Sequence, residues 1–205
     1  GGSDNARVSS DGSCIVFEST ANNLAATIAG SVNNVYVRDL ASNNTILVSK
    51  KPGATAGGNG QSFNATPNAD CSAIVFETQA TDLFSGVSDT NGGTDIALWR
   101  RSTMSISALS VTPGGASTGN GGSTKPVMAV ATDMTNMKIA FESSANNLVA
   151  GDTSYTDVFV WSAGPGIGFD TLELVTEKHL GTGTSAGGLS PSIDALGTGV
   201  AFMSD

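Results

Sequence analysis

The strongest constraint on this chain is a short apolar segment that occurs four times. Its copies, each with Phe as the third residue, are Ile15–Glu18, Ile74–Glu77, Ile139–Glu142 and Val200–Met203. The phenylalanines are 59, 65 and 61 residues apart. This period is too long for solenoid repeats and is typical of a four-stranded sheet with long loops. Each repeat is therefore expected to form one small sheet, with its phenylalanine (Phe17, Phe76, Phe141 or Phe202) buried between neighbouring sheets.

The other landmarks of the repeat keep their order along the chain. A turn-like motif follows the apolar segment at Ala21–Leu24, Ala80–Leu83 and Ala145–Leu148. Third strands are expected at 34–38, 95–99 and 157–161, and fourth strands at 45–49, 106–111 and 172–176. Less regular first strands are expected at 6–9, 64–67, 127–131 and 192–195, and irregular linkers at 52–62, 113–123 and 181–190. No segment has the apolar spacing of an amphipathic helix, so the chain is expected to be all-β.

The arrangement that best suits such units is a β-propeller, because radially packed four-stranded blades bury both faces of each sheet. We expect antiparallel blades of about 60 residues and a single partial propeller over residues 1–205, with about three and a half blades. Blade 1 is placed at about 5–50, blade 2 at about 62–112, blade 3 at about 124–177 and the first half of blade 4 at about 189–205. The open edge favours pairing with the rest of a longer chain or with a neighbouring subunit.

The order of these motifs resembles a known propeller repeat. A small strand containing Ser or Pro and an Asp-Gly-type turn are followed by Ile-Val-Phe-Glu-Ser, Ala-Asn-Asn-Leu and Thr-Asp-Val-Phe-Val. This series is similar, over essentially the whole chain, to the bacterial TolB-like, WD40-like (PD40) β-propeller repeat. The resemblance implies a propeller fold and an exported bacterial setting. It implies no particular activity, since such repeats occur in proteins of very different roles.

Charge and hydropathy exclude two classes of partner. Nine Lys and Arg stand against 18 Asp and Glu, which gives a formal charge of −9 and a pI near 4.3. A chain this acidic lacks the basic surface that binds a phosphate backbone, so nucleic acid is not expected as a partner. No apolar run approaches the roughly 18 residues of a membrane span, so none is expected.

The two cysteines bear on both compartment and structure. Only 13% of the residues are charged, and small polar residues are abundant, a composition more usual in exported proteins. An extracellular or periplasmic location is therefore expected. Cys14 and Cys71 flank equivalent turns of successive repeats, which predicts a disulfide between blades 1 and 2. Two buried free thiols are the alternative.

One loop has the spacing of a calcium site. Asp89, Asn91 and Asp95 place oxygen-bearing side chains at the first, third and seventh positions of a glycine-containing loop. Calcium is accordingly the one cofactor that the sequence indicates. Blade 3 keeps a thinner version with Asp152, Ser154 and Asp157, whereas the corresponding loop of blade 1 has no carboxylate. An Asx-rich turn that bonds its own backbone is the alternative interpretation.

No catalytic residue is predicted. Gly183–Gly187 matches the G-x-S-x-G spelling of a hydrolase elbow but lies in a linker, and His179 is the chain's single histidine. The glutamates at 18, 77 and 142 recur at one blade position, which favours a structural role over a catalytic pair. Trp99 and Trp161 also occupy matching strand positions, which favours packing over a sugar-binding platform.

Three functional hypotheses remain at this point. The first is a non-catalytic exported propeller that binds a protein, a glycan or a surface polymer through its loops. The second is a structural subunit of an extracellular fibre or surface layer, assembled through exposed blade edges. The third is an accessory propeller of a larger enzyme.

Overall fold

The computed structural model describes residues 1–25, 32–130, 135–153, 155–164, 170–176 and 187–204. Within these ranges all regular secondary structure is β-strand, which confirms the expected all-β class. The same ranges contain no helix with the length and apolarity needed to cross a membrane. Three positions singled out in the sequence, Ser154, His179 and most of 183–187, lie outside the described residues.

Three four-stranded antiparallel sheets and one two-stranded sheet follow one another along the described chain. Each four-stranded sheet pairs its strands in sequence order, as a meander. Sheet 1 contains β1 (Ser3–Val8), β2 (Cys14–Ser19), β3 (Asn34–Asp39) and β4 (Asn44–Leu47). Sheet 2 contains β5 (Ser62–Pro67), β6 (Ala73–Thr78), β7 (Asp95–Arg100) and β8 (Ser105–Ala108). Sheet 3 contains β9 (Ser123–Met128), β10 (Lys138–Ser143), β11 (Asp157–Ser162) and β12 (Thr171–Leu174), and sheet 4 contains β13 (Leu189–Ile193) and β14 (Val200–Met203).

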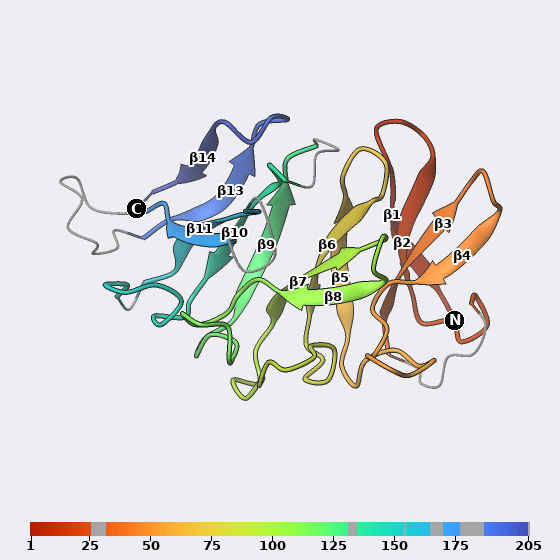
Figure 1. The fold of residues 1–205 in the computed structure, drawn as a ribbon, viewed down its shortest axis with the longest axis horizontal. Coiled ribbons are helices and arrows are strands. Elements are labelled where there is room, and N and C mark those ends of the chain that lie inside the picture. Colours follow the sequence, from red (N-terminus) through yellow and green to blue (C-terminus); the bar gives the residue numbers. More distant parts are fainter. Residues whose placement is uncertain (26–31, 131–134, 154, 165–169, 177–186, 205) are drawn as a thin grey trace.

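The sheets are arranged face to face in chain order, from sheet 1 at the right of Figure 1 to sheet 4 at the left. The first strand of each sheet packs across the first three strands of the sheet before it. Thus β5 contacts β1, β2 and β3, β9 contacts β5, β6 and β7, and β13 contacts β9, β10 and β11. First strands therefore gather along one side of the row of sheets.

The hydrophobic core is divided between the sheets. Along β6, Ile74 and Phe76 pack into the core between sheets 1 and 2, while Ala73 and Val75 pack into the core between sheets 2 and 3. This follows from the period of two in a strand, which sends successive side chains to opposite faces. Sheet 2 is buried on both faces, and this explains why its central strands are almost continuously apolar.

The recurring phenylalanines were expected to be buried, and the structure confirms this for Phe76 and Phe141, which are both 0% exposed. The expectation is wrong for Phe202, which is 36% exposed, and Phe17 is only half-buried. This repeat position points toward the preceding sheet. Among the described residues no sheet precedes sheet 1, and the sheet that carries Phe202 has only two strands.

The first strands begin two to four residues earlier than the sequence pattern indicates. Each contains a β-bulge at the same place, between Asp4 and Arg7 in β1 and between Phe63 and Thr66 in β5. An extra residue in one strand breaks the alternation of inward and outward side chains. The alternation of apolar and polar residues is therefore lost in the early part of each first strand, which is the part that the sequence pattern did not predict.

Candidate functional site: the junctions between sheets

A buried glutamate near the end of the second strand of each four-stranded sheet reaches across to the next sheet. Glu18 accepts a hydrogen bond of 2.6 Å from the backbone N–H of Asn64, and Glu77 accepts one of 2.8 Å from that of Lys125. Glu142 accepts the equivalent bond from the backbone N–H of Ser190. The three glutamates are only 2 to 4% exposed. We call this repeated contact the glutamate bridge.

The residues that donate to the glutamate bridge share a rare backbone conformation. Asn64, Lys125 and Ser190 have φ angles of +53°, +52° and +54°, and each lies in the bulge of its first strand. The left-handed region costs a residue other than glycine roughly 1 kcal/mol or more. A charge-assisted hydrogen bond to a carboxylate offsets that cost. Asn5, in the matching bulge of β1, has the same conformation with φ +49°.

Each glutamate is also held from within its own sheet. The donors are the side chains at the bulge: Asn5 Nδ2 to Glu18 at 3.1 Å, Asn64 Nδ2 to Glu77 at 2.9 Å and Lys125 Nζ to Glu142 at 3.0 Å. Burial raises the pKa of Glu77, and the hydrogen bonds oppose that rise. The expectation that these recurring glutamates are structural is confirmed, since their carboxylates hold the bulge and join the sheets.

A second contact between sheets binds the linkers 52–62 and 113–123 to the turn-like motif that follows each of them. Asn120 donates its backbone N–H to Asn147 Oδ1 at 2.9 Å, and its own Oδ1 accepts the N–H of Asn146 at 3.0 Å. Asn59 makes the same pair of bonds with Asp82 and Thr81. The turn-like motifs therefore serve as docking points for the linkers.

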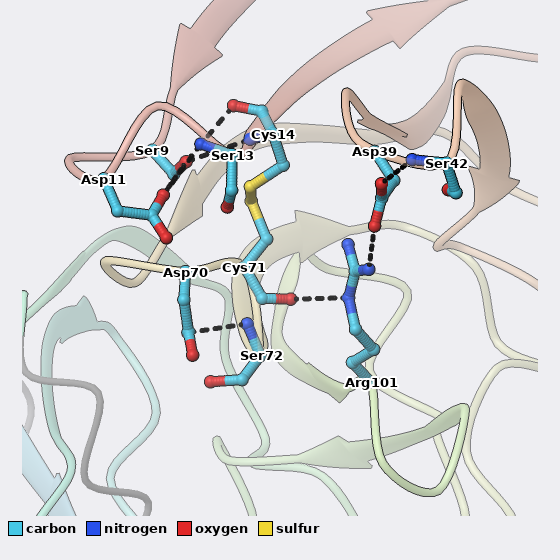
Figure 2. A network of polar contacts seen from close by, with 10 residues as sticks. All are labelled: Ser9, Asp11, Ser13, Cys14, Asp39, Ser42, Asp70, Cys71, Ser72 and Arg101. Carbon is cyan, nitrogen blue, oxygen red and sulfur yellow. Dashed lines mark hydrogen bonds and ion pairs between the residues drawn. A yellow bond between two sulfur atoms is a disulfide. The ribbon is translucent and has the colours of Figure 1, made fainter.

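The junction between sheets 1 and 2 has two further connections, which Figure 2 shows. Cys14 at the start of β2 forms a disulfide with Cys71 in the β5–β6 turn, with the Cα atoms 6.4 Å apart, as predicted. Arg101 donates to Asp39 Oδ2 of sheet 1 at 2.7 Å and to the carbonyl oxygen of Cys71 at 3.2 Å. The backbone N–H of Ser42 and the Arg101 guanidinium lower the pKa of Asp39 to about 2.

The predicted calcium loop lies at the junction between sheets 2 and 3, and its three residues converge. Asp95, fully buried at the start of β7, accepts a hydrogen bond from Ser110 Oγ at 2.8 Å through Oδ1. Its Oδ2 is buried and has no hydrogen-bond partner. Burial, together with the negative charge of Asp89, raises the pKa of Asp95 to about 7, while the hydrogen bond from Ser110 opposes the rise.

Asn91 forms the Asx-type turn that was the alternative interpretation of this loop. Its Oδ1 accepts the N–H of Gly93, and its Nδ2 donates to the carbonyl oxygens of Gly119 at 2.7 Å and Gly121 at 3.3 Å. Asn91 thereby fixes the loop against the linker that leads into sheet 3. The side-chain oxygens left for a cation are those of the two carboxylates, although Asp89 Oδ1 also accepts from Thr118 Oγ1 at 3.3 Å and Asp95 Oδ1 from Ser110 Oγ.

The same arrangement recurs at the junction between sheets 3 and 4. Asp157 is fully buried at the start of β11, and its Oδ1 accepts hydrogen bonds from Thr176 Oγ1 at 2.6 Å and from the N–H of Gly187 at 3.2 Å. Asp157 Oδ2 and both carboxylate oxygens of Asp152 are buried without a hydrogen-bond partner. Burial and the charge of Asp157 raise the pKa of Asp152 to about 6.

The corresponding position of sheet 1 is neutral and satisfied. Asn34 at the start of β3 accepts from Ser49 Oγ at 2.9 Å and donates to the carbonyl oxygen of Val32 at 3.0 Å. Within the described residues no group of three or more His, Cys, Asp and Glu side chains is suited to a metal. The acidic sites are therefore pairs of carboxylates, one at each of two junctions.

Neither tryptophan is available as a binding platform. Trp99 is 1% and Trp161 5% exposed, so their role is packing, as expected. Arg100 lies over the Trp161 ring, 5.7 Å from its centroid. Comparison of the sequence with protein-family models and with curated proteins gives no match.

Proposed function

We propose that this chain is a non-catalytic, exported β-propeller scaffold of the TolB-like, WD40-like type, which binds a protein, a glycan or a surface polymer. The observation that carries the proposal is the use of the recurring acids. The carboxylates of these acids, Glu18, Glu77 and Glu142, accept backbone N–H groups of the next sheet and so join one sheet to the next. A catalytic carboxylate pair instead needs two different environments that separate the two pKa values.

The packing of the sheets supports the propeller class. The first strands pack across the preceding sheet, and this close approach along one side suits the wedge-shaped blades that a propeller needs around its axis. The disulfide supports export, because such bonds persist in oxidising compartments and are rare in the cytosol. Chemistry that changes the bound partner is not part of the proposal.

Cosedimentation with insoluble polysaccharides such as chitin, cellulose and peptidoglycan tests binding and catalysis together. The expected result is saturable retention of the folded chain by one of them, with no soluble fragments released. Release of sugar fragments by purified chain would contradict the non-catalytic assignment. A chain whose disulfide has been reduced and whose fold has been lost by heating is the control for adhesion.

A structural subunit of a fibre or surface layer is the second candidate, and the outer face of sheet 1 favours it. Asn5 presents a left-handed backbone N–H to that face, and within the described residues no neighbouring carboxylate meets it. Phe17, which is half-buried on this face, stacks on the fully buried Tyr36 with ring centroids 5.5 Å apart. This face has the features that join sheets elsewhere in the molecule.

Sedimentation velocity and electron microscopy of the purified chain separate the two candidates. Discrete particles with the mass of one chain support the binding scaffold. Long regular assemblies that grow with concentration support the structural subunit.

A further inference from the structure

Two junctions of this molecule contain more buried negative charge than their protein neighbours neutralise. At each, a fully buried aspartate begins the third strand and lies beside a second aspartate from the preceding loop. Asp95 and Asp157 each have one carboxylate oxygen without a hydrogen-bond partner, and Asp152 has two. A carboxylate oxygen taken out of water without a partner is unfavourable, and a like charge beside it adds to the penalty.

The junction between sheets 1 and 2 shows that the fold does not need a negative charge at this position. Asn34 occupies the position of Asp95 and Asp157, and it accepts the same hydrogen bond from a hydroxyl group that lies two residues beyond the fourth strand. An amide is therefore sufficient to complete the structural role. The buried carboxylates carry a charge that this structural role does not require, and each lies close enough to the second acid of its pair for the two charges to interact.

We propose that the Asp89–Asp95 pair and the Asp152–Asp157 pair each bind one Ca²⁺ ion, which neutralises the pair and fastens the loop to the third strand. Calcium is the cation that the chemistry fits. All candidate ligand atoms are oxygens, which hard cations prefer, and no thiol or imidazole is present in either pair. Loop oxygens and water suit the flexible coordination of Ca²⁺ better than the strict octahedron of Mg²⁺. Two carboxylates per ion leave most of the shell to carbonyl oxygens and water.

The natural Asn34 junction supplies well-matched test variants. D95N and D157N copy a residue that the fold already accepts at the equivalent place, so both are expected to fold. D4N, at an exposed site in β1, removes the same formal charge and is the control. Full-length chain is freed of cations with a chelator and titrated with CaCl₂ in a calorimeter, and its melting is followed with and without CaCl₂.

The expected stoichiometry is two Ca²⁺ per wild-type chain, two for D4N, and one for each of D95N and D157N. At free Ca²⁺ 100-fold above Kd, each occupied site shifts the unfolding equilibrium by about 100-fold toward the folded chain. The order of stability is expected to invert, with D95N at least as stable as wild type in chelator and less stable than wild type in CaCl₂. A merely structural aspartate would give no calcium-dependent inversion.

Zero stoichiometry overturns the proposal and leaves each pair to share a proton. Calcium binding that D95N and D157N both leave unchanged also overturns it, because the ion then binds elsewhere. A stoichiometry of one that D95N abolishes supports the first site and overturns the second, and the reverse holds for D157N.

Discussion

Glu77 on β6 accepts the backbone N–H of Lys125 on β9 at 2.8 Å, so a side chain of sheet 2 fixes the backbone of sheet 3. Lys125 holds a left-handed conformation at that point, with φ +52°. The same relationship links Glu18 to Asn64. One hydrogen bond thus combines two functions, since it stabilises an unfavourable bulge and sets how successive sheets are aligned.

Replacing Glu77 with Ala is expected to lower the free energy of unfolding by about 1 to 3 kcal/mol, because buried donors are left without an acceptor. The donors are the Lys125 N–H and the Asn64 amide. Chemical denaturation of wild type, E77A and E173A gives the comparison. Glu173 is an exposed strand residue, so E173A is expected to remain within about 0.5 kcal/mol of wild type. Equal losses in the two variants would rule out a special role for Glu77.

Loss of the disulfide is expected to destabilise the chain by about 2 to 4 kcal/mol, because the cross-link restricts the unfolded chain over a separation of 57 residues. The C14S/C71S double variant is compared with wild type by thermal melting, each with and without reductant. Reductant should lower the Tm of wild type alone. A double variant that melts with oxidised wild type would contradict the prediction.

The recurring phenylalanines are expected to differ sharply in their contribution to stability. F76A is expected to cost about 3 to 5 kcal/mol, because it opens a cavity between sheets 1 and 2. F202A should cost less than about 1 kcal/mol, since 36% of that residue is already exposed. Denaturant unfolding of the two variants tests the difference, and similar costs would show that sheet 4 is buried in solution.

The hydrogen bond that Asp39 accepts from the Ser42 backbone N–H, together with its ion pair to Arg101, is expected to make stability depend on acid pH. The folded-state pKa of Asp39 is lowered to about 2 from 3.8, so its contribution is fully present above pH 3.8. It is lost as the pH falls through about 2. The Tm difference between wild type and D39N should therefore be constant near neutral pH and shrink between pH 4 and pH 2. A difference that does not change over this interval would disprove the assignment.

The sequence predicts the repeat and the second and third strands well, because apolar and β-branched residues dominate in those strands. It also predicts the disulfide, because Cys14 and Cys71 flank equivalent turns of successive repeats. Its prediction of first strands is poorer because Asn64, Lys125 and Ser190 share a conformation and no chemical type. Their common role is to donate a backbone N–H, a group that every residue except proline has, so no residue type marks the position in the sequence. Recurrence at 18, 77 and 142 correctly indicated structural glutamates without revealing their partners.

The candidate calcium sites show a similar division. Loop spacing brought Asp89, Asn91 and Asp95 to notice, and the structure does place them together. The hydroxyl partners Ser110 and Thr176 lie two residues beyond the ends of β8 and β12, and only the folded sheet places them beside the aspartates. Local spacing indicates candidate ligands, but it does not show which of their oxygens the fold already uses.

The central claim is that a glutamate bridge joins each sheet to the next, and backbone amide exchange measured by NMR tests it most directly. The N–H groups of Asn64 and Lys125 are expected to exchange slowly, and that of Asn5 rapidly in the isolated chain, because only the first two donate to a glutamate of a preceding sheet. In E77A, protection should fall at Lys125 and persist at Asn64. Rapid exchange at all three positions in wild type, or protection of Lys125 unchanged in E77A, would contradict the account.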